Sequence, residues 1–156
     1  MRSVLLTAIF LTTSILNAQS VINAVTDAAS YSPRVSPGAL ATIFGNRLAN
    51  NAAQATSFPL PLNLGGASVY AVQSQNQMQA ALVYASPTQI NFQVPTGLTP
   101  GTASIYVTTA AGNSLSFTVN VVSAGPSIFQ DTSNHAVAQN ASAGNTTNSA
   151  AHPAAS

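Results

Sequence analysis

The stretch Ala85-Ser-Pro-Thr-Gln-Ile-Asn-Phe-Gln-Val-Pro95 decides the fold class of this 156-residue chain. Its centre alternates strictly between apolar residues and amides, and the apolar positions are Ile90, Phe92 and Val94. An alternation of period two is typical of a half-buried β-strand. Proline near both ends limits the strand, because proline lacks the N–H that a central strand donates. A register slip of one residue would bury three amides, so the stretch predicts a firmly fixed strand.

Short segments of similar character recur between turns rich in glycine, proline and asparagine. We expect strands within residues 21–25, 38–45, 67–72, 78–85, 103–109 and 115–121. The inner face of the last strand is predicted to carry Leu115, Phe117, Val119 and Val121. About seven short strands at regular spacing, with no amphipathic helix, predict an all-β fold and, more specifically, an immunoglobulin-like β-sandwich.

Two further segments are expected to be irregular. Residues 46–55 are predicted to form a short helical turn or an irregular loop. Residues 58–62 contain two prolines, so they are expected to run extended along a sheet edge.

Charged residues are scarce, at 3% of the chain, whereas about 25% is usual in a globular protein. The charged side chains are Arg2, Asp27, Arg34, Arg47 and Asp131. Solubility therefore depends on Asn, Gln, Ser and Thr, which we expect on the outer faces of the strands. Nucleic-acid binding is not expected, because neutralising several phosphates requires a cluster of cations.

The N-terminus has the features of an export signal. Arg2 precedes the apolar run Val4–Leu16, and Ala18-Gln19-Ser20 provides a small-x-small cleavage site. We predict a signal peptide at residues 1–20, secretion or display at the cell surface, and no transmembrane span after cleavage. The alternatives are a buried N-terminal strand and a retained membrane anchor. The chain has no cysteine, so disulfides are excluded.

The predicted sandwich occupies residues 21–130, and the composition changes after it. Residues 131–156 are dominated by Ala, Asn, Ser, Thr and Gly. Such a segment buries too little apolar area to offset its ordering entropy. We therefore expect a low-complexity flexible tail there.

Several motifs resemble known modules. Residues 36–48, Ser-Pro-Gly-Ala-Leu-Ala-Thr-Ile-Phe-Gly-Asn-Arg-Leu, resemble the opening of IPT/TIG domains, which are immunoglobulin-like modules of cell-surface receptors and bacterial surface proteins. Residues 87–95 and 100–113 resemble the central strand and following hairpin of these domains. The resemblance implies an exported β-sandwich of IPT/TIG type.

A closer resemblance is to the Solibacter uncharacterised C-terminal domain family of bacterial exported proteins. The similar motifs are Asn23–Ser32, Ser36-Pro-Gly38, Leu60-Pro-Leu62, Gly65-Gly66, Tyr84–Pro95 and Ala124-Gly-Pro-Ser-Ile-Phe129. This resemblance implies the fold and export but no catalytic activity. Members of that family continue into a further β-rich half, so the chain is expected to be either a minimal single module or a truncated product.

Catalytic and metal-binding residues are poorly represented. The two histidines, His135 and His152, both fall in the predicted tail. An arrangement of serine with His135 and Asp131 would have to be built on mobile chain, whereas catalysis requires a rigid support. Two histidines without cysteine or glutamate do not supply a usual metal-ligand set. We therefore expect no enzyme activity, no metal and no cofactor.

The candidate binding residues are aromatic and cationic. Tyr70 and Tyr106 lie opposite the inward set of their strands, so their rings are available either to stack on a sugar or to pack at the sheet margin. Arg47 is a candidate contact for an acidic sugar or a partner carboxylate. For Arg34 the alternatives are such a contact, a salt bridge to Asp27, or hydrogen bonds to loop carbonyls.

The sequence thus favours a non-enzymatic exported β-sandwich module that serves protein interaction or acts as a structural spacer at the cell surface. The alternative is a carbohydrate-binding module that uses exposed tyrosines and an Asn/Gln face. The candidate ligand-binding residues are Tyr70, Tyr106 and Arg47. The expected partners are a protein or a cell-envelope glycan, and the oligomeric state stays open.

Overall fold

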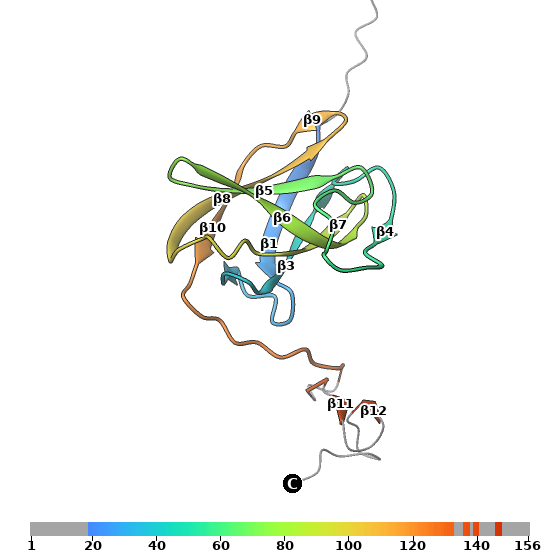
Figure 1. Cartoon of the computed structure of the whole chain (residues 1–156), viewed down its shortest axis with the longest axis vertical. Coiled ribbons are helices and arrows are strands. Elements are labelled where there is room, and N and C mark those ends of the chain that lie inside the picture. The colour runs from blue at the N-terminus through green and yellow to red at the C-terminus, as the bar shows by residue number, and fades with distance from the viewer. Residues whose placement is uncertain (1–18, 133–135, 138, 141–145, 148–156) are drawn as a thin grey trace, which may run out of the picture.

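The computed structural model describes residues 19–132, 136–137, 139–140 and 146–147, and none of them is helical (Figure 1). The prediction of an all-β fold is confirmed. Nearly all of the predicted signal peptide lies outside the described residues, as do both histidines.

Ten strands form one continuous sheet. They are β1 Val21–Asp27, β2 Arg34–Val35, β3 Leu40–Asn46, β4 Ala53–Gln54, β5 Ser68–Gln73, β6 Asn76–Ala85, β7 Gln89–Gln93, β8 Gly101–Thr109, β9 Gly112–Asn113 and β10 Phe117–Val121. The order across the sheet is β1-β3-β7-β6-β5-β8-β10-β2, with β4 added to β6 and β9 added to β8. Every pairing is antiparallel except β10 with β2.

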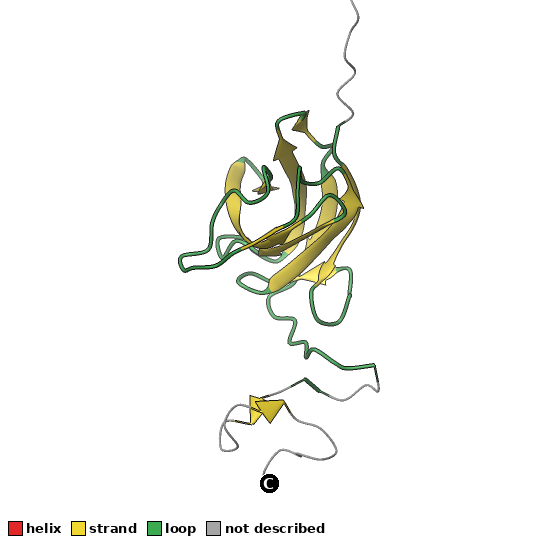
Figure 2. Cartoon of the chain, turned by 90° about the vertical axis from the view of Figure 1, so that its right-hand side faces the viewer, coloured by secondary structure: helices red, strands yellow, loops and turns green. Residues whose placement is uncertain are grey.

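Strand β6 joins the two halves of the sheet. Its first half, residues 76–80, pairs with β5, whereas residues 81–85 pair with β7. A register irregularity between Leu82 and Tyr84 accompanies this change of partner, and such irregularities increase strand twist. The sheet therefore wraps around its own core (Figure 2), and β1 at one end contacts β10 and β2 at the other.

The alternating strand around Phe92 lies in the middle of this arrangement, between β3 and β6. Ile90, Phe92 and Val94 are completely buried, and Gln93 is exposed. The predicted facing of the strand is confirmed. The amide of Asn91 accepts a hydrogen bond of 3.1 Å from the Thr42 hydroxyl of β3, so the outer face is also tied to its neighbour.

The predicted inner face of the last strand begins too early, because Leu115 was expected to point inward and does not. Its side chain is 84% exposed. Ser114 is buried instead, because its main-chain N–H donates to the Val107 carbonyl and its hydroxyl accepts from the Val107 N–H. The chain leaves the ladder at this point, and β10 begins only at Phe117. Val119 and Val121 are buried as predicted.

Both segments that were expected to be irregular form hydrogen bonds with the sheet. Residues 46–55 contain no helical turn, and Ala53–Gln54 forms β4. Residues 58–62 form no strand, but the Pro61 carbonyl accepts a hydrogen bond from the Leu82 N–H at 2.8 Å. The 58–62 segment therefore runs beside β6, as an extended edge segment should.

Part of the predicted tail has local pairing. β11 Gln139–Asn140 and β12 Thr146–Thr147 form a two-stranded antiparallel sheet. An isolated bridge also joins Gln130 to Ala136.

Candidate functional site

The structure brings Tyr70 and Tyr106 together on the outer face of the sheet. Tyr70 in β5 is the direct register partner of Tyr106 in β8. Their neighbours Ala71 and Ile105 point inward and are fully buried, so both tyrosines must point outward. The rings stack with centroids 5.2 Å apart and planes 15° apart. Such a cross-strand aromatic pair stabilises a sheet by about 0.5–1 kcal/mol.

Stacking changes what the tyrosines offer to a ligand. Both side chains are half-buried, and each covers part of one face of the other ring. Burial raises the pKa of the Tyr106 hydroxyl, and the neighbouring Tyr70 raises it further. The Tyr106 phenol therefore stays protonated near neutral pH and acts as a hydrogen-bond donor and acceptor.

The surface around the tyrosine pair is polar and uncharged. Gln79 of β6 lies opposite Tyr70 in the register. Across β8, Ser104 pairs with Thr118, and Thr102 pairs with Asn120. By strand alternation these residues share the outward face with the tyrosines. Together they form a surface that we call the tyrosine face: Tyr70, Tyr106, Gln79, Ser104, Thr118, Thr102 and Asn120.

Arg47 does not belong to the tyrosine face. It follows β3 in a loop, has a positive φ of 54° and is exposed. Its main-chain carbonyl accepts a hydrogen bond of 2.7 Å from the Ser20 hydroxyl. Among the residues that the structure describes, the Arg47 side chain forms no hydrogen bond or ion pair with either tyrosine. Of the three predicted ligand-binding residues, Tyr70 and Tyr106 are therefore neighbours, whereas Arg47 lies apart from them.

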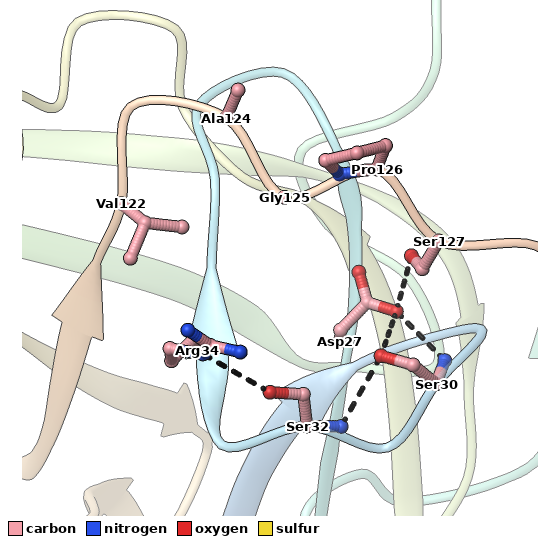
Figure 3. Close-up of a pocket in the computed structure, with 9 residues that line it drawn as sticks. All are labelled: Asp27, Ser30, Ser32, Arg34, Val122, Ala124, Gly125, Pro126 and Ser127. Carbon is pink, nitrogen blue, oxygen red and sulfur yellow. Dashed lines mark hydrogen bonds between the residues drawn. The ribbon is translucent and has the colours of Figure 1, made fainter.

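A second polar site was not anticipated as a pocket from the sequence. A cavity of about 220 Å³ is lined by Asp27, Ser30, Ser32, Arg34, Val122, Ala124, Gly125, Pro126 and Ser127 (Figure 3). Its walls come from the loop after β1, from β2 and from the segment that leaves β10. The cavity contains two of the chain's five charged side chains.

Asp27 organises this pocket. It is 7% exposed, and its Oδ1 accepts four hydrogen bonds. The donors are the main-chain N–H groups of Ala29 and Ser30 and the hydroxyls of Ser30 and Ser127, at 2.7–3.0 Å. Burial alone would raise the pKa of Asp27, but the hydrogen bonds together outweigh it and lower the pKa below its ordinary value.

Arg34 faces the same pocket without pairing with Asp27. Its Nε donates to the Ser32 hydroxyl at 3.5 Å (Figure 3). Within the described part of the chain no ion pair joins Arg34 to Asp27, so of the alternatives for Arg34 the salt bridge is wrong. The link between Asp27 and Ser127 spans 100 residues of sequence, which explains why sequence reasoning missed it. A local signal did exist in Asp27-Ala-Ala-Ser30, since an Asp side chain often accepts hydrogen bonds from the main chain of its own turn.

The predicted amide surface is largely engaged within the protein. Gln73 holds the Thr99 main chain, donating to its carbonyl at 2.8 Å and accepting from its N–H at 2.9 Å. Gln89 donates to Asn91 at 2.8 Å, and Gln93 donates to the Gly38 carbonyl at 3.1 Å. These amides fasten loops and neighbouring strands, which reduces what they offer to a glycan.

The described residues contain no group of three or more His, Cys, Asp or Glu side chains placed to hold a metal ion. Asp131 is exposed and lines a neighbouring cavity with Ser30 and Ser127. His135, which was considered with Asp131 as a catalytic pair and not favoured, lies outside the described residues. Nothing in the described part of the chain forms a helix of membrane-spanning length and hydrophobicity.

Comparisons with known proteins give a likeness of fold. No protein-family model matches the chain, and no curated protein matches it. One similar solved structure, described as a candidate DNA-binding protein of Bacteroides vulgatus, has 18% identity and a TM-score of 0.50 and is matched over 67% of this chain. Another, gamma-CGTase from alkalophilic Bacillus clarkii, has 16% identity and a TM-score of 0.46 and is matched over 70% of this chain.

The match covers 48% of the first structure and 13% of the second. The chain therefore corresponds to about half of one protein and to a small part of the other. At these identities the likeness concerns the fold alone.

Proposed function

We propose that the chain is an exported, immunoglobulin-like β-sandwich module of IPT/TIG type that contacts another protein at the cell surface without catalysing a reaction. Support for the fold type comes from the resemblance of residues 36–48 and 84–95 to such modules. The all-β sheet is compatible with this fold type. The Solibacter-type family is the family we propose for the chain.

The observation that carries the proposed contact is the stacked pair of Tyr70 and Tyr106 on an uncharged outer face. Tyrosine is enriched where proteins meet, because one side chain supplies apolar area and a hydroxyl at low entropic cost. A pair already fixed by stacking loses little further freedom when a partner binds. The surrounding amides and hydroxyls can form the polar rim of such a contact.

The alternative, a carbohydrate-binding module, is favoured less by the same geometry. A sugar ring packs on the open face of an aromatic ring, and here each tyrosine covers part of the other. The amides that would donate to sugar hydroxyls are mostly engaged in loop contacts, as for Gln93. DNA binding, which describes one similar structure, is not proposed, because Arg34 and Arg47 do not form a cationic cluster on one site.

Site-specific photocrosslinking on the producing cells tests the proposal. A photoreactive residue replaces Ser104, which lies on the tyrosine face and leaves both tyrosines intact. The matched control replaces Asn23, an exposed residue of β1. We expect a discrete protein adduct from position 104, absent from position 23 and lost in the Tyr70→Ala/Tyr106→Ala variant. Adducts with glycan, or equal adducts from both positions, would reject the proposed contact.

Export is tested separately by the mass of the protein recovered outside the cell. We expect the mass of a chain that begins near residue 19 or 21, after removal of the signal peptide. Recovery of the intact N-terminus in the membrane fraction would favour the retained anchor instead.

A further inference from the structure

Strand β6 has an edge that no described strand covers. Residues 76–80 pair with β5 on one side. On the other side, β7 pairs with β6 only over residues 81–85. The two strands then separate, so the first half of β6 ends the local sheet on that side.

The register shows which main-chain groups face this open edge. Gln73 and Asn76 close a two-residue turn between β5 and β6. The closing pair of such a hairpin is hydrogen-bonded, and bonded and non-bonded pairs alternate from there. The N–H and C=O groups of Gln77 and Gln79 therefore point away from β5. Within the described residues no backbone hydrogen bond reaches either of them.

The chain that follows β7 forms the opposite wall of a groove along this edge. Val94 is fixed to Ala39 and Gly38 by two main-chain hydrogen bonds of 2.9 Å, which draw the chain away from β6. The chain then runs back toward β8 (Figure 1), where the Gln73 side chain holds Thr99. The space between has a volume of about 500 Å³.

The groove lining is mostly apolar and has no charged side chain. It consists of Leu62, Met78, Gln79, Ala81, Gln93, Val94, Pro95, Thr96 and Gly97. The side-chain amides of Gln79 and Gln93 each donate one hydrogen bond to a main-chain carbonyl. Met78 is half-buried, and its flexible thioether adapts to the shape of a ligand. The unpaired main-chain groups of Gln79 on β6 add to the polar groups of this lining.

We propose that this groove binds an extended peptide segment with uncharged side chains, which adds to β6 as a further strand. Donor and acceptor groups on alternate residues, Gln77 and Gln79, match the repeat of an extended backbone. No charged side chain lines the groove to attract a charged peptide. The groove shares Gln79 with the tyrosine face but does not include the tyrosine pair, and its proposed role goes beyond the proposed function.

Hydrogen exchange on the full exported chain gives the first test. In the free protein, the amides of Met78 and Ala80 should exchange slowly because they face β5, whereas those of Gln77 and Gln79 should exchange fast. Slow exchange of Gln77 and Gln79 in the free protein would overturn the proposal. Protection of these two amides that rises with protein concentration alone would assign the edge to self-association and overturn it as well.

Peptide binding gives the second test, with a phage-displayed library of random decapeptides as the probe. We expect enriched peptides to be uncharged and, as synthetic peptides, to slow exchange at Gln77 and Gln79. Gln79→Pro removes the edge N–H, and Gln79→Thr is the matched control because it keeps that N–H while losing the same side chain.

We expect binding about tenfold weaker for Gln79→Pro and within about twofold of wild type for Gln79→Thr, since tenfold corresponds to about one hydrogen bond. No enrichment, or equal affinity for the two variants, would overturn the proposal. If Gln79→Pro fails to fold, the exchange measurement on the wild-type complex still decides.

Discussion

Replacement of Asp27 by Asn should destabilise the protein through the pocket at the end of β1. The substitution keeps the size of the side chain and removes its charge. Oδ1 of Asp27 accepts four hydrogen bonds, from Ala29, from Ser30 twice and from Ser127. A bond to a charged acceptor contributes about 1.5–3 kcal/mol and a neutral one about 0.5–1.5 kcal/mol.

The expected magnitude follows from these values. Four donors share the lone pairs of one oxygen, so we take the equivalent of two full bonds, each weakened by about 1 kcal/mol. The free energy of unfolding at pH 6 should therefore fall by about 2 kcal/mol in Asp27→Asn.

The same interaction predicts a pH dependence. The fold lowers the pKa of Asp27 below its ordinary value of 3.8, so the contribution of Asp27 to stability is present above about pH 4 and is lost as the pH falls further. The chain has two carboxylate side chains, Asp27 and the exposed Asp131. Acid destabilisation should therefore be smaller in Asp27→Asn than in the wild type.

Urea unfolding followed by circular dichroism at pH 6 and at pH 2.5 measures both effects. The wild type and the control Asp131→Asn should lose stability between the two pH values, and Asp27→Asn should lose much less. If Asp27→Asn matched the wild type at pH 6, or showed the same drop in acid, the hydrogen-bond explanation of the pocket would be wrong.

Three further predictions test the core and the sheet, each by denaturant unfolding. Phe92→Ala should cost about 3–5 kcal/mol because Phe92 is fully buried, and Gln93→Ala well under about 1 kcal/mol; the reverse ranking would contradict the facing of β7. Thr26→Val should be neutral or stabilising by up to about 1 kcal/mol, because the Thr26 hydroxyl is buried without a hydrogen-bond partner; a clear loss would mean that the hydroxyl has a partner. A Cβ at Gly45 would collide with a main-chain carbonyl of β1, so Gly45→Ala should cost more than about 2 kcal/mol. Gly125→Ala should cost much less, because the nearest atom is 3.5 Å from the new Cβ. Equal costs would refute the close approach of β1 to β3.

The parts of the fold that depend on local alternation were predictable from the sequence. Phe92 and its apolar neighbours differ in polarity from the residues between them, so their facing follows from the period of a strand. The same reasoning failed at Leu115, where the chain leaves the ladder and Ser114 turns inward. A run of alternating residues does not reveal where a strand begins, because a buried serine with main-chain partners replaces an apolar residue at little cost.

The candidate sites were predictable only in part, for a similar reason. That Tyr70 and Tyr106 point outward followed from each strand alone, but their stacking depends on β5 and β8 being neighbours in one register. The pocket at Asp27 requires Ser127, which lies 100 residues away. Contacts between distant segments are set by the topology of the sheet, and the pattern of one strand contains no information about them.

The central claim is that the tyrosine face contacts a protein on the cell surface, and binding of the purified module to cells tests it most directly. The chain has no cysteine, so a single Cys at the exposed position Asn23 carries one fluorescent label. We expect saturable binding of the labelled module that is lost after protease treatment of the cells and is at least about tenfold weaker for Tyr70→Ala/Tyr106→Ala. Equal binding by the tyrosine variant, or binding that survives protease but is removed by glycosidases, would contradict the claim.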